Sequence, residues 1–351
     1  MPLATVLHCA TAKGVYTLTQ DTAGTWNVRN HAHADWSVPK LGWHPERPER
    51  VFAGTRGDGV WVSYDFGKTW RKPSYGKQGP GKVRCVTVDP HDSNRVYAGT
   101  EPIGILVSND AGDNWCTLDS LWDIPGLEQI TYPVSTVEPH IRDIVFDTKR
   151  PGTLYAALQV GYMLKSLDHG ATWQVLDEGL DADVHTIAID PSNSDCLFVA
   201  TGGHDYRKGT APGRSLYKSM DAGESWQPTA MEFQQEYSVP LAMHSNHPEI
   251  IYSALANGTP GQWKRQPKGA EAIIIRTQDS GRTWKSLTEG LQETQGTFAE
   301  AIALDPDDPD HVYAGLRNGA IYASDNGGDS WRNLNVDLPN ISDIKCVGRL
   351  H

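Results

Sequence analysis

Cysteine is scarce in this 351-residue sequence, and its five copies form no motif. They are odd in number, widely separated and never spaced as C-x-x-C: Cys9, Cys85, Cys116, Cys196 and Cys346. This distribution excludes a disulfide framework and favours reduced, mostly buried thiols. We therefore expect a cytoplasmic protein.

Positive charge and long hydrophobic runs are also in short supply. Against 43 acidic residues stand 31 lysines and arginines, which gives a formal net charge of −12. Because phosphate binding requires cations that displace counterions, this balance argues against nucleic acids and anionic membranes as partners. The first residues, MPLATVLHCATAKG, contain no basic segment followed by an apolar stretch. We expect neither a signal peptide nor a membrane span.

The sequence does contain one eight-residue motif, which is repeated along the whole chain. Five close copies are SYDFGKTW (63–70), SNDAGDNW (108–115), SLDHGATW (166–173), SMDAGESW (219–226) and TQDSGRTW (277–284), and two weaker ones are TQDTAGTW (19–26) and SDNGGDSW (324–331). Their tryptophans are 44 to 58 residues apart, and the interval counted across the termini, 46 residues, falls in the same range. Repeats of this length are typical of propellers and solenoids.

Each repeat contains short segments rich in β-branched and aromatic residues, and helical periodicity is almost absent. Examples are VRCVTVDP (83–90), RVYAGT (95–100) and the segment that leads into the next copy of the motif. We predict four antiparallel strands per repeat, named A to D from the centre outward. TVLHCAT (5–11) and GVYTLTQD (14–21) suit strands B and C, and ISDIKCVGRL (341–350) suits a strand A. The prediction is an all-β, seven-bladed β-propeller in a single domain, residues 1–351, whose first blade is closed by the C-terminal strand.

The residue types of the motif are those that stabilise a tight turn. A short carboxylate accepts backbone N–H groups in a tight turn, and a glycine two residues later permits the backbone angles required. We expect a structural role for the residues at the acidic position: Asp21, Asp65, Asp110, Asp168, Asp221, Asp279 and, in the last copy, Asn326. Ala23 replaces the glycine of the first copy and Asn326 replaces the aspartate of the last one. We therefore expect these two turns to be the loosest.

The S-x-D-x-G-x-T-W pattern resembles the Asp-box, or BNR repeat, along essentially the whole chain. This repeat occurs in sialidases, sortilin-type receptors, xyloglucan-hydrolysing glycosidases and a photosystem assembly factor. The resemblance implies that the boxes lie on the face opposite the ligand site. Function is then expected at the loops between strands D and A and between strands B and C.

Aligning the predicted A strands on their Asp-Pro-like ends gives one equivalent position near the upper face of each blade. These positions hold Lys345, Pro39, Arg84, Arg142, His185, the Glu236–Tyr237 region and Glu300. Cations gathered in an acidic protein favour an anionic ligand such as a carboxylate, which arginine contacts through two N–H groups. The alternative is that these side chains pair with one another and line a solvated channel.

Two further groups of residues fall in the predicted upper loops. His31, His33, His140 and His185 are suitable ligands for a divalent metal such as Zn, Mn or Cu, unless they are only solvated or hydrogen-bonded. Trp36, Trp122 and Trp263 offer aromatic platforms for sugar rings, unless each packs its own loop against the sheets.

Three functions remain open. A carbohydrate-active enzyme of glycoside-hydrolase-like type would use two carboxylates, from Asp35, Asp143, Asp205, Glu236 and Glu300. Tyr237 beside Glu236 resembles the Tyr–Glu pair of sialidases, but the Arg-Ile-Pro signature of that family is missing. A metal-dependent lyase or hydrolase would hold its substrate with Arg84 and Arg142 and use Glu300 or His185 as base. A non-enzymatic scaffold for protein assembly is the third. We favour the first, acting on an anionic sugar or similar small molecule.

Overall fold

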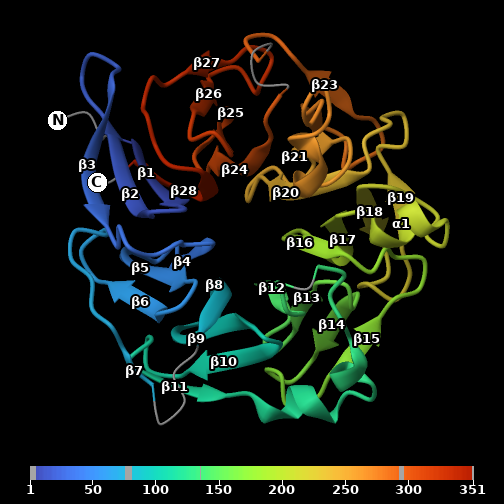
Figure 1. The fold of residues 1–351 in the computed structure, drawn as a ribbon. Coiled ribbons are helices and arrows are strands. Elements are labelled where there is room, and N and C mark those ends of the chain that lie inside the picture. Colours follow the sequence, from blue (N-terminus) through green and yellow to red (C-terminus); the bar gives the residue numbers. More distant parts are fainter. Residues whose placement is uncertain (1–4, 76–80, 135, 292–295, 350–351) are drawn as a thin grey trace. The chain divides into compact units, whose positions relative to one another are not determined.

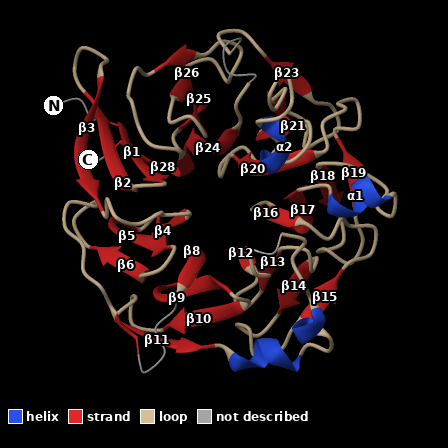
Figure 2. Cartoon of the chain, viewed as in Figure 1, coloured by secondary structure: helices blue, strands red, loops and turns tan. Residues whose placement is uncertain are grey.

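The computed structural model describes residues 5–75, 81–134, 136–291 and 296–349. The chain divides into two compact units, the first formed by Met1–Val38 with Thr229–His351 and the second by Pro39–Pro228. Strands make up most of both units, with only short helical segments between them (Figure 2). Among the described residues, no helix is long and apolar enough to cross a membrane.

The second unit contains four antiparallel sheets whose strands mostly follow one another along the chain (Figure 1). In chain order the strands are β4 (Lys40–His44), β5 (Arg47–Thr55) and β6 (Gly59–Ser63); β7 (Ser74–Tyr75), β8 (Lys82–Asp89), β9 (Asp92–Glu101), β10 (Gly104–Ser108) and β11 (Asn114–Thr117); β12 (Ile141–Phe146), β13 (Leu154–Leu158), β14 (Met163–Ser166) and β15 (Gln174–Leu176); β16 (Val184–Asp190), β17 (Asn193–Thr201), β18 (Leu216–Ser219) and β19 (Gln227–Thr229). Its helical segments are η1 (Asp119–Asp123), η2 (Leu127–Gln129) and α1 (His204–Lys208).

The first unit contains three four-stranded antiparallel sheets. Their strands are β28 (Ile341–Arg349), β1 (Thr5–Thr11), β2 (Gly14–Gln20) and β3 (Trp26–Ala32); β20 (Tyr237–Met243), β21 (Ile251–Ala256), β22 (Ile273–Thr277) and β23 (Lys285–Leu287); β24 (Ala299–Asp305), β25 (Asp308–Leu316), β26 (Ile321–Ser324) and β27 (Arg332–Asn333). A short helix, α2 (Pro260–Trp263), follows β21.

The fold is a seven-bladed β-propeller, as the repeat predicts. The first sheet has the order β28-β1-β2-β3, so the C-terminal strand is its innermost member and the N-terminal strand is paired on both sides (Figure 1). This confirms the predicted closure of the first blade. The prediction of a single domain is not tested by these contacts.

Two sheets depart from four strands. The sheet of β4, β5 and β6 has three, and its outer edge is a single bridge between Val62 and Arg71. The next residues along the chain leave this sheet, and β7 pairs in parallel with β11 of the following one, which therefore has five strands.

The second strand of each sheet contains a continuous run of buried residues. β13, for example, has all five residues buried, which is expected of a strand covered on both faces. The first strand alternates instead, as β24 does with its pattern of buried and half-buried residues. Clusters of buried side chains combine residues of neighbouring sheets, such as Phe52 of β5 with Val86 of β8 and Trp115 of β11.

Each copy of the repeated motif forms a turn of the same kind between the third and fourth strands. We call it the octapeptide turn. In the copy at 63–70, Asp65 Oδ1 accepts the Ser63 hydroxyl and the Thr69 N–H, both at 2.8 Å. The Thr69 hydroxyl donates to Asp65 Oδ2 at 2.6 Å, and the Gly67 N–H donates to Ser63 Oγ at 2.8 Å. Phe66 and Gly67 both have positive φ, which explains the glycine.

Several octapeptide turns also contact the sheet that precedes them. The hydroxyl of Tyr97 donates to the carbonyl of His169 at 2.8 Å, and Tyr155 does the same toward Ala222 at 3.1 Å. A Cβ on Gly112 would lie 2.7 Å from the ring of Phe52, so the turn glycine is also required by packing. The octapeptide turns thus hold neighbouring sheets together within each unit.

The first and last copies differ in an unexpected way. The turn at 19–26 lacks the hydroxyl-centred bonds, since Thr19 instead accepts from Arg29 at 2.7 Å. Asn326, however, keeps the whole pattern: its Oδ1 accepts from Ser330 N–H at 2.9 Å and its Nδ2 donates to Ser330 Oγ at 2.9 Å. The prediction that the last turn is loose was therefore wrong, because an amide supplies the same acceptor.

The indole N–H groups of the repeated motif have a hydrogen-bond partner in only some copies. Trp70 and Trp115 each donate to a turn carbonyl at 3.0 Å. In the described part of the chain, those of Trp26, Trp173, Trp226 and Trp331 have no partner. Packing, rather than hydrogen bonding, is therefore the common role of these tryptophans.

Candidate functional site

The two ends of each sheet differ in what they present. The octapeptide turns lie at the end where the first and second strands connect: the Ala111 N–H, for example, donates to the carbonyl of Asn94 near the start of β9. The opposite end holds the start of the first strand and the end of the second. We call these the turn end and the bulge end.

A β-bulge marks the bulge end in most sheets. In the β8–β9 pair, Val83 lies opposite Thr100 and Cys85 opposite Gly99, so that Arg84 is the extra residue. The same shift occurs in four other sheets and makes the extra residues, the bulge residues, Arg142, His185, Glu300 and Ser342. Bulges redirect a side chain and are common next to functional sites.

The sequence alignment therefore found four of these positions and misplaced two. Arg84, Arg142, His185 and Glu300 are bulge residues, as the Asp-Pro alignment implied. Lys345 is not: the bulge residue of β28 is Ser342, and Lys345 lies further along, paired with Asp343 at 3.3 Å. In β20 the register shifts between Ser238 and Leu241, so the Glu236–Tyr237 region lies before the shift.

In the second unit, four cations lie near one another, and two of them pair with the carboxylate of Glu101. Lys82 Nζ lies 2.9 Å from Glu101 Oε1, and Arg84 forms an ion pair with Glu101 Oε2. The backbone of Arg56 forms an isolated antiparallel β-bridge with that of Lys82. We call Arg56, Lys82, Arg84 and Arg142 the arginine cluster. Burial, then the charge of Arg56, lowers the pKa of Arg84 to about 10 despite Glu101, and Arg142 acts in the same direction. The cluster therefore brings four positive charges near two carboxylates, Glu101 and, beside Arg142, Asp183.

Glu101 is held ionised by its surroundings. Although burial acts to raise its pKa, the hydrogen bond from Lys82 and the charge of Arg84 keep that pKa below its usual value. Its Oε1 also accepts the Glu138 N–H at 3.5 Å, which brings the loop before β12 to the cluster.

His140 lies at the end of that loop and is almost fully buried, with 1% of its surface exposed. Its Nδ1 is 2.8 Å from the carbonyl of Glu138, and its own carbonyl accepts the Gln159 N–H at 3.0 Å. Its Nε2 has no hydrogen-bond partner in the described part of the chain. Burial, followed by the charge of Arg84, lowers the pKa of His140 to about 3.

His185 belongs to a polar network beside the cluster. Its Nε2 lies 3.2 Å from Asp183 Oδ1 and 3.4 Å from Gln159 Nε2. Gln159 in turn accepts from Arg142 at 3.3 Å and donates to the Tyr132 hydroxyl at 2.9 Å. Burial acts to raise the pKa of Asp183, but the charges of His185 and Arg142 hold it far below its usual value.

Gly202 makes room for this network. A Cβ at this position would lie 1.9 Å from Asp183 Oδ2 and 2.9 Å from His185 Cε1. Only glycine therefore allows β17 to end against the Asp183–His185 pair.

Asp143 and Asp205, both considered as catalytic carboxylates, have structural partners. Asp143 lies 2.5 Å from Lys40 Nζ and accepts the Ile187 N–H at 3.1 Å. Asp205 accepts the Tyr162 hydroxyl and the Ala182 N–H, both at 3.2 Å, and its own N–H donates to Asp181.

The first unit brings together Tyr237, Trp263 and Glu300. Arg317 lies 3.2 Å from Glu300 and its guanidinium sits 5.4 Å from the centre of the Trp263 ring. Tyr237 meets Trp263 edge-on at 5.6 Å. Glu236 accepts the Gly258 N–H at 3.0 Å in the loop before α2.

Trp263 differs from the expected sugar platform. It is 8% exposed, and its indole donates to the carbonyl of Asn257 at 2.9 Å. A capping box between Thr259 and Gln262 fixes α2 in this position. Trp263 therefore packs its own loop against the sheets, because the short helix turns the ring inward.

Trp122 was also placed incorrectly. It is 53% exposed, but it lies in η1, whose Ser120 donates to the carbonyl of Gly170 in an octapeptide turn. The loop at 116–140 therefore begins at the turn end, and only its later part, from Tyr132 to His140, reaches the arginine cluster. Trp36 is half-buried, and its carbonyl accepts the Gly14 N–H at 2.8 Å.

The predicted metal site is not assembled. Among the described residues, no group of three or more His, Cys, Asp or Glu side chains is arranged to hold a metal ion. His31 stacks on Tyr16 at 4.0 Å and its Nε2 lies 2.7 Å from the carbonyl of Lys13. His33 has a positive φ, and Asp35 is exposed on the same loop.

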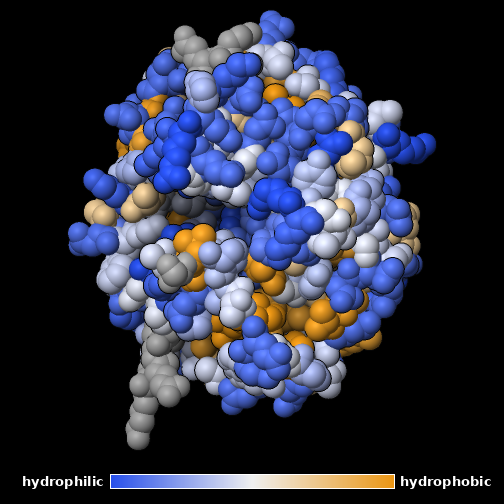
Figure 3. Space-filling model, turned by 45° about the vertical axis from the view of Figure 1, so that its right-hand side comes forward, coloured by the Kyte–Doolittle hydropathy of each residue, from blue (hydrophilic) through white to orange (hydrophobic). Residues whose placement is uncertain are grey.

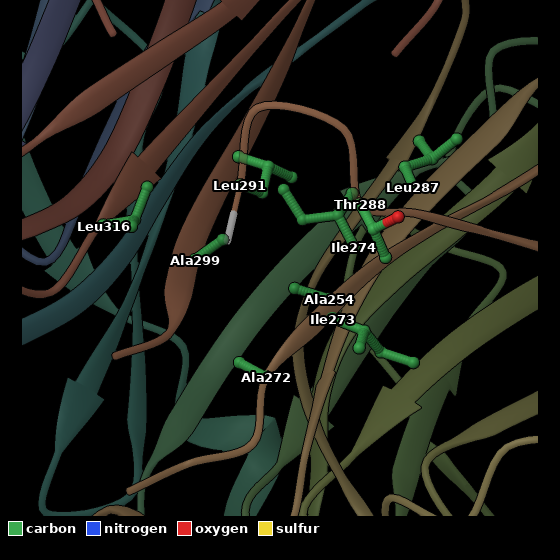
Figure 4. A pocket seen from close by; sticks show the side chains of 9 residues that line it. All are labelled: Ala254, Ala272, Ile273, Ile274, Leu287, Thr288, Leu291, Ala299 and Leu316. Atoms are coloured by element: carbon green, nitrogen blue, oxygen red, sulfur yellow. The ribbon is translucent and has the colours of Figure 1, made fainter. Parts of the chain in front are cut away.

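A separate apolar pocket lies between β21–β22 and β24–β25 of the first unit (Figure 4). Ile274, Leu291, Ala299 and Leu316 line it, and Thr288 supplies its one polar side chain. It contains no charged group to hold an anion. Hydrophilic residues otherwise cover most of the face shown in Figure 3, in keeping with the acidic composition.

Several residues of the site escaped the sequence alignment although a signal was available. Each of them comes directly after a second-strand segment, which reads RVFAGT, RVYAGT, TLYAAL, CLFVAT or HVYAGL. In the same order these residues are Arg56, Glu101, Gln159, Gly202 and Arg317, and Glu101 is itself the last residue of β9. Three of them interact with the bulge residue of the same sheet: Glu101 with Arg84, Gln159 with Arg142, and Arg317 with Glu300. Aligning second strands as well as first strands would have found them.

Comparison with known proteins supports the fold and gives a direction for function. No family model matches the chain. A xyloglucanase of Acetivibrio thermocellus is 23% identical over 211 residues, and one of Hypocrea jecorina is 21% identical over 215. The match covers 54% of this chain and 25% of each relative. The chain thus spans about a quarter of these curated proteins.

Among solved structures, the GH74 xyloglucanase of Xanthomonas campestris superposes with a TM-score of 0.70 and 16% identity, covering 99% of this chain and 53% of that one. The chain resembles GH74 xyloglucanases. YCF48 bound to D1 peptide superposes with a TM-score of 0.60 and 15% identity, covering 92% of this chain and 94% of that one. At these identities the likeness shows the propeller fold.

Proposed function

We propose that this chain is a carbohydrate-active protein of glycoside-hydrolase-like type that binds an anionic, carboxylate-bearing ligand at the bulge end of the second unit. One observation carries the proposal: Lys82 and Arg84 both pair with the buried Glu101, and the charges of Arg56 and Arg142 also act on Arg84, in a protein whose net charge is −12. The similarity to xyloglucanases supports a sugar as the ligand. We also infer that the octapeptide turns are Asp-box repeats.

The arrangement assigns roles to individual residues. Arg84 and Arg142 hold the carboxylate, since guanidinium groups offer paired N–H donors. His185 is the group that transfers a proton, with Asp183 as its orienting partner at 3.2 Å. Glu101, kept ionised by Lys82 and Arg84, stabilises positive charge that develops on the ligand.

Calorimetric titration with glucuronate and galacturonate oligosaccharides tests this proposal. Replacing Arg142 by Gln leaves the Glu101 ion pairs intact and should weaken binding about 10- to 100-fold, because a charge-assisted hydrogen bond contributes about 1.5–3 kcal/mol. Arg150, which pairs with Asp195 at 2.6 Å at the turn end of the same sheet, provides the control R150Q. Equal binding of a neutral xyloglucan oligosaccharide, unaffected by R142Q, would contradict the proposal.

A second candidate is a non-enzymatic protein that binds an anionic peptide. It is favoured by one solved structure, YCF48 bound to D1 peptide, whose fold matches 92% of this chain. Binding without any turnover of glycoside substrates, together with tighter binding of an acidic peptide than of sugar acids, would establish this alternative. The metal-dependent lyase loses support, since no metal-binding group is formed among the described residues.

A further inference from the structure

The Nε2 atom of His140 is a buried acceptor that the protein itself does not satisfy. The Glu138 carbonyl, 2.8 Å from Nδ1, can only accept, so Nδ1 carries the proton. Nε2 is then left with a lone pair and, in the described part of the chain, no donor. Because burying an unsatisfied polar atom is unfavourable, such an atom in a native site calls for a partner.

The immediate surroundings of His140 are cationic. Cys85 Sγ lies 3.8 Å from the carbonyl of Ile141, so their neighbours Arg84 and His140 approach each other where β8 meets β12. Arg84 Nε is also buried without a hydrogen-bond partner among the described residues. The site thus offers an unused donor on Arg84 and an unused acceptor on His140, and the two do not bond to each other.

A ligand that fits this pair must accept from Arg84 and donate to His140. A plain carboxylate can only accept, and a neutral sugar lacks the charge that the arginine cluster favours. A molecule with both a carboxylate and a nearby hydroxyl satisfies each atom. Such molecules are the sugar acids, in which a hydroxyl lies one or two carbons from the carboxyl-bearing carbon.

We propose that the arginine cluster recognises a sugar acid, with the ligand carboxylate on Arg84 and a neighbouring ligand hydroxyl donating to Nε2 of His140. This inference rests on the proposed function and narrows its ligand class. His140 is then the residue that determines specificity, and it acts as a neutral acceptor. The lowered pKa of His140, about 3, keeps that lone pair available at physiological pH.

The experiment compares four small probes on the full chain by calorimetry. Glucuronate has both groups, cyclohexanecarboxylate lacks the hydroxyls, glucose lacks the carboxylate, and N-acetylglycine carries an amide N–H beside its carboxylate. We expect glucuronate to bind about tenfold or more tightly than cyclohexanecarboxylate, and glucose to bind weakest. In H140F, which keeps an aromatic ring beside Tyr132, glucuronate should fall to the affinity of cyclohexanecarboxylate.

The matched control is H91F. His91 lies at the turn end, where its Nε2 is 3.0 Å from the carbonyl of Asp147, so the preference for glucuronate should survive its loss. Equal binding of glucuronate and cyclohexanecarboxylate by the unchanged protein would overturn the inference while leaving the carboxylate site standing. So would an equal loss of both probes in H140F, which would mean a structural role only.

Two other outcomes are distinguishable from these. If neither carboxylate binds, the proposed function itself fails. If N-acetylglycine binds most tightly of the four, the donor that His140 accepts is a peptide N–H, and the sugar-acid assignment is wrong.

Discussion

The two ends of each sheet use polar residues in opposite ways. At the turn end, Asp65 and its equivalents direct both carboxylate oxygens to groups of their own eight residues. At the bulge end, Arg84 reaches Glu101 on β9, Arg142 reaches Gln159 directly after β13, and His140 Nε2 has no partner among the described residues. Local satisfaction gives stability, whereas unsatisfied groups at the edge of a rigid scaffold leave capacity for a ligand.

The acidic residues illustrate the difference. Hydrogen bonds from Thr283, its N–H first and then its hydroxyl, lower the pKa of Asp279 to about 2. Glu101 owes its lowered pKa to ion pairs with Lys82 and Arg84 that act against its burial. The octapeptide turns therefore have a structural role. The charged side chains of the proposed site lie at the bulge end, where the repeat is least regular.

The largest expected effect is on stability at the turn end. Trp226 is 1% exposed and packs against the preceding sheet, so W226A should lower the free energy of unfolding by about 3–5 kcal/mol. Urea denaturation measures the loss. Trp122, 53% exposed, is the control, and W122A should change stability by about 0.5 kcal/mol or less. Comparable losses in the two variants would remove the distinction between packed and exposed tryptophans.

A smaller effect is expected on acidification, through a bulge-end residue. The pKa of His140 is about 3 in the folded chain and 6.5 in the unfolded one, so between these values only the unfolded chain binds the proton. Stability is therefore fully present above pH 6.5 and falls as the pH drops toward 3, by about 1.4 kcal/mol per pH unit for this residue. Buried His8, with a pKa of about 4, adds its own loss between pH 6.5 and 4.

Urea denaturation at pH 7 and pH 5 checks this contribution. H140F should reduce the difference between the two values by about 2 kcal/mol, because one histidine that titrates only when unfolded has been removed. An unchanged difference would show that His140 takes up its proton in the folded chain.

The smallest effect is predicted for the turn carboxylates themselves. Asn326 preserves the full bonding pattern of the octapeptide turn, so D279N should change stability by about 0.5 kcal/mol or less and leave ligand binding intact. Thermal unfolding and titration with glucuronate give both values. A loss of binding in D279N would place function at the turn end and reverse the comparison.

The success of the sequence alignment depended on regular strand ends. Arg84, Arg142, His185 and Glu300 were found because each stands at a fixed distance before an Asp at the strand end, namely Asp89, Asp147, Asp190 and Asp305. It failed in β20, where His244 replaces that Asp, and in β28, which has no following hairpin to align. The rule was sound, but these two strands lack its reference point.

Other features could not be read from residue types. Trp263 and Trp122 look alike in sequence, yet α2 buries one and η1 places the other beside Gly170. No local sequence pattern predicts that the hydroxyl of Tyr97 donates to the carbonyl of His169, 72 residues away. Such contacts depend on which loop folds back on which sheet, and this is settled by packing among distant segments.

The amino-acid sequence alone determined the number and kind of sheets, because the octapeptide turn is a local structure whose bonds stay within eight residues. It also determined the closing of the first blade, since only the C-terminal segment could supply the missing first strand. The tertiary structure decided which charges meet. Arg84 and Glu101 become a site only when strand register, a bulge and the loop that carries Glu138 and His140 bring these residues together.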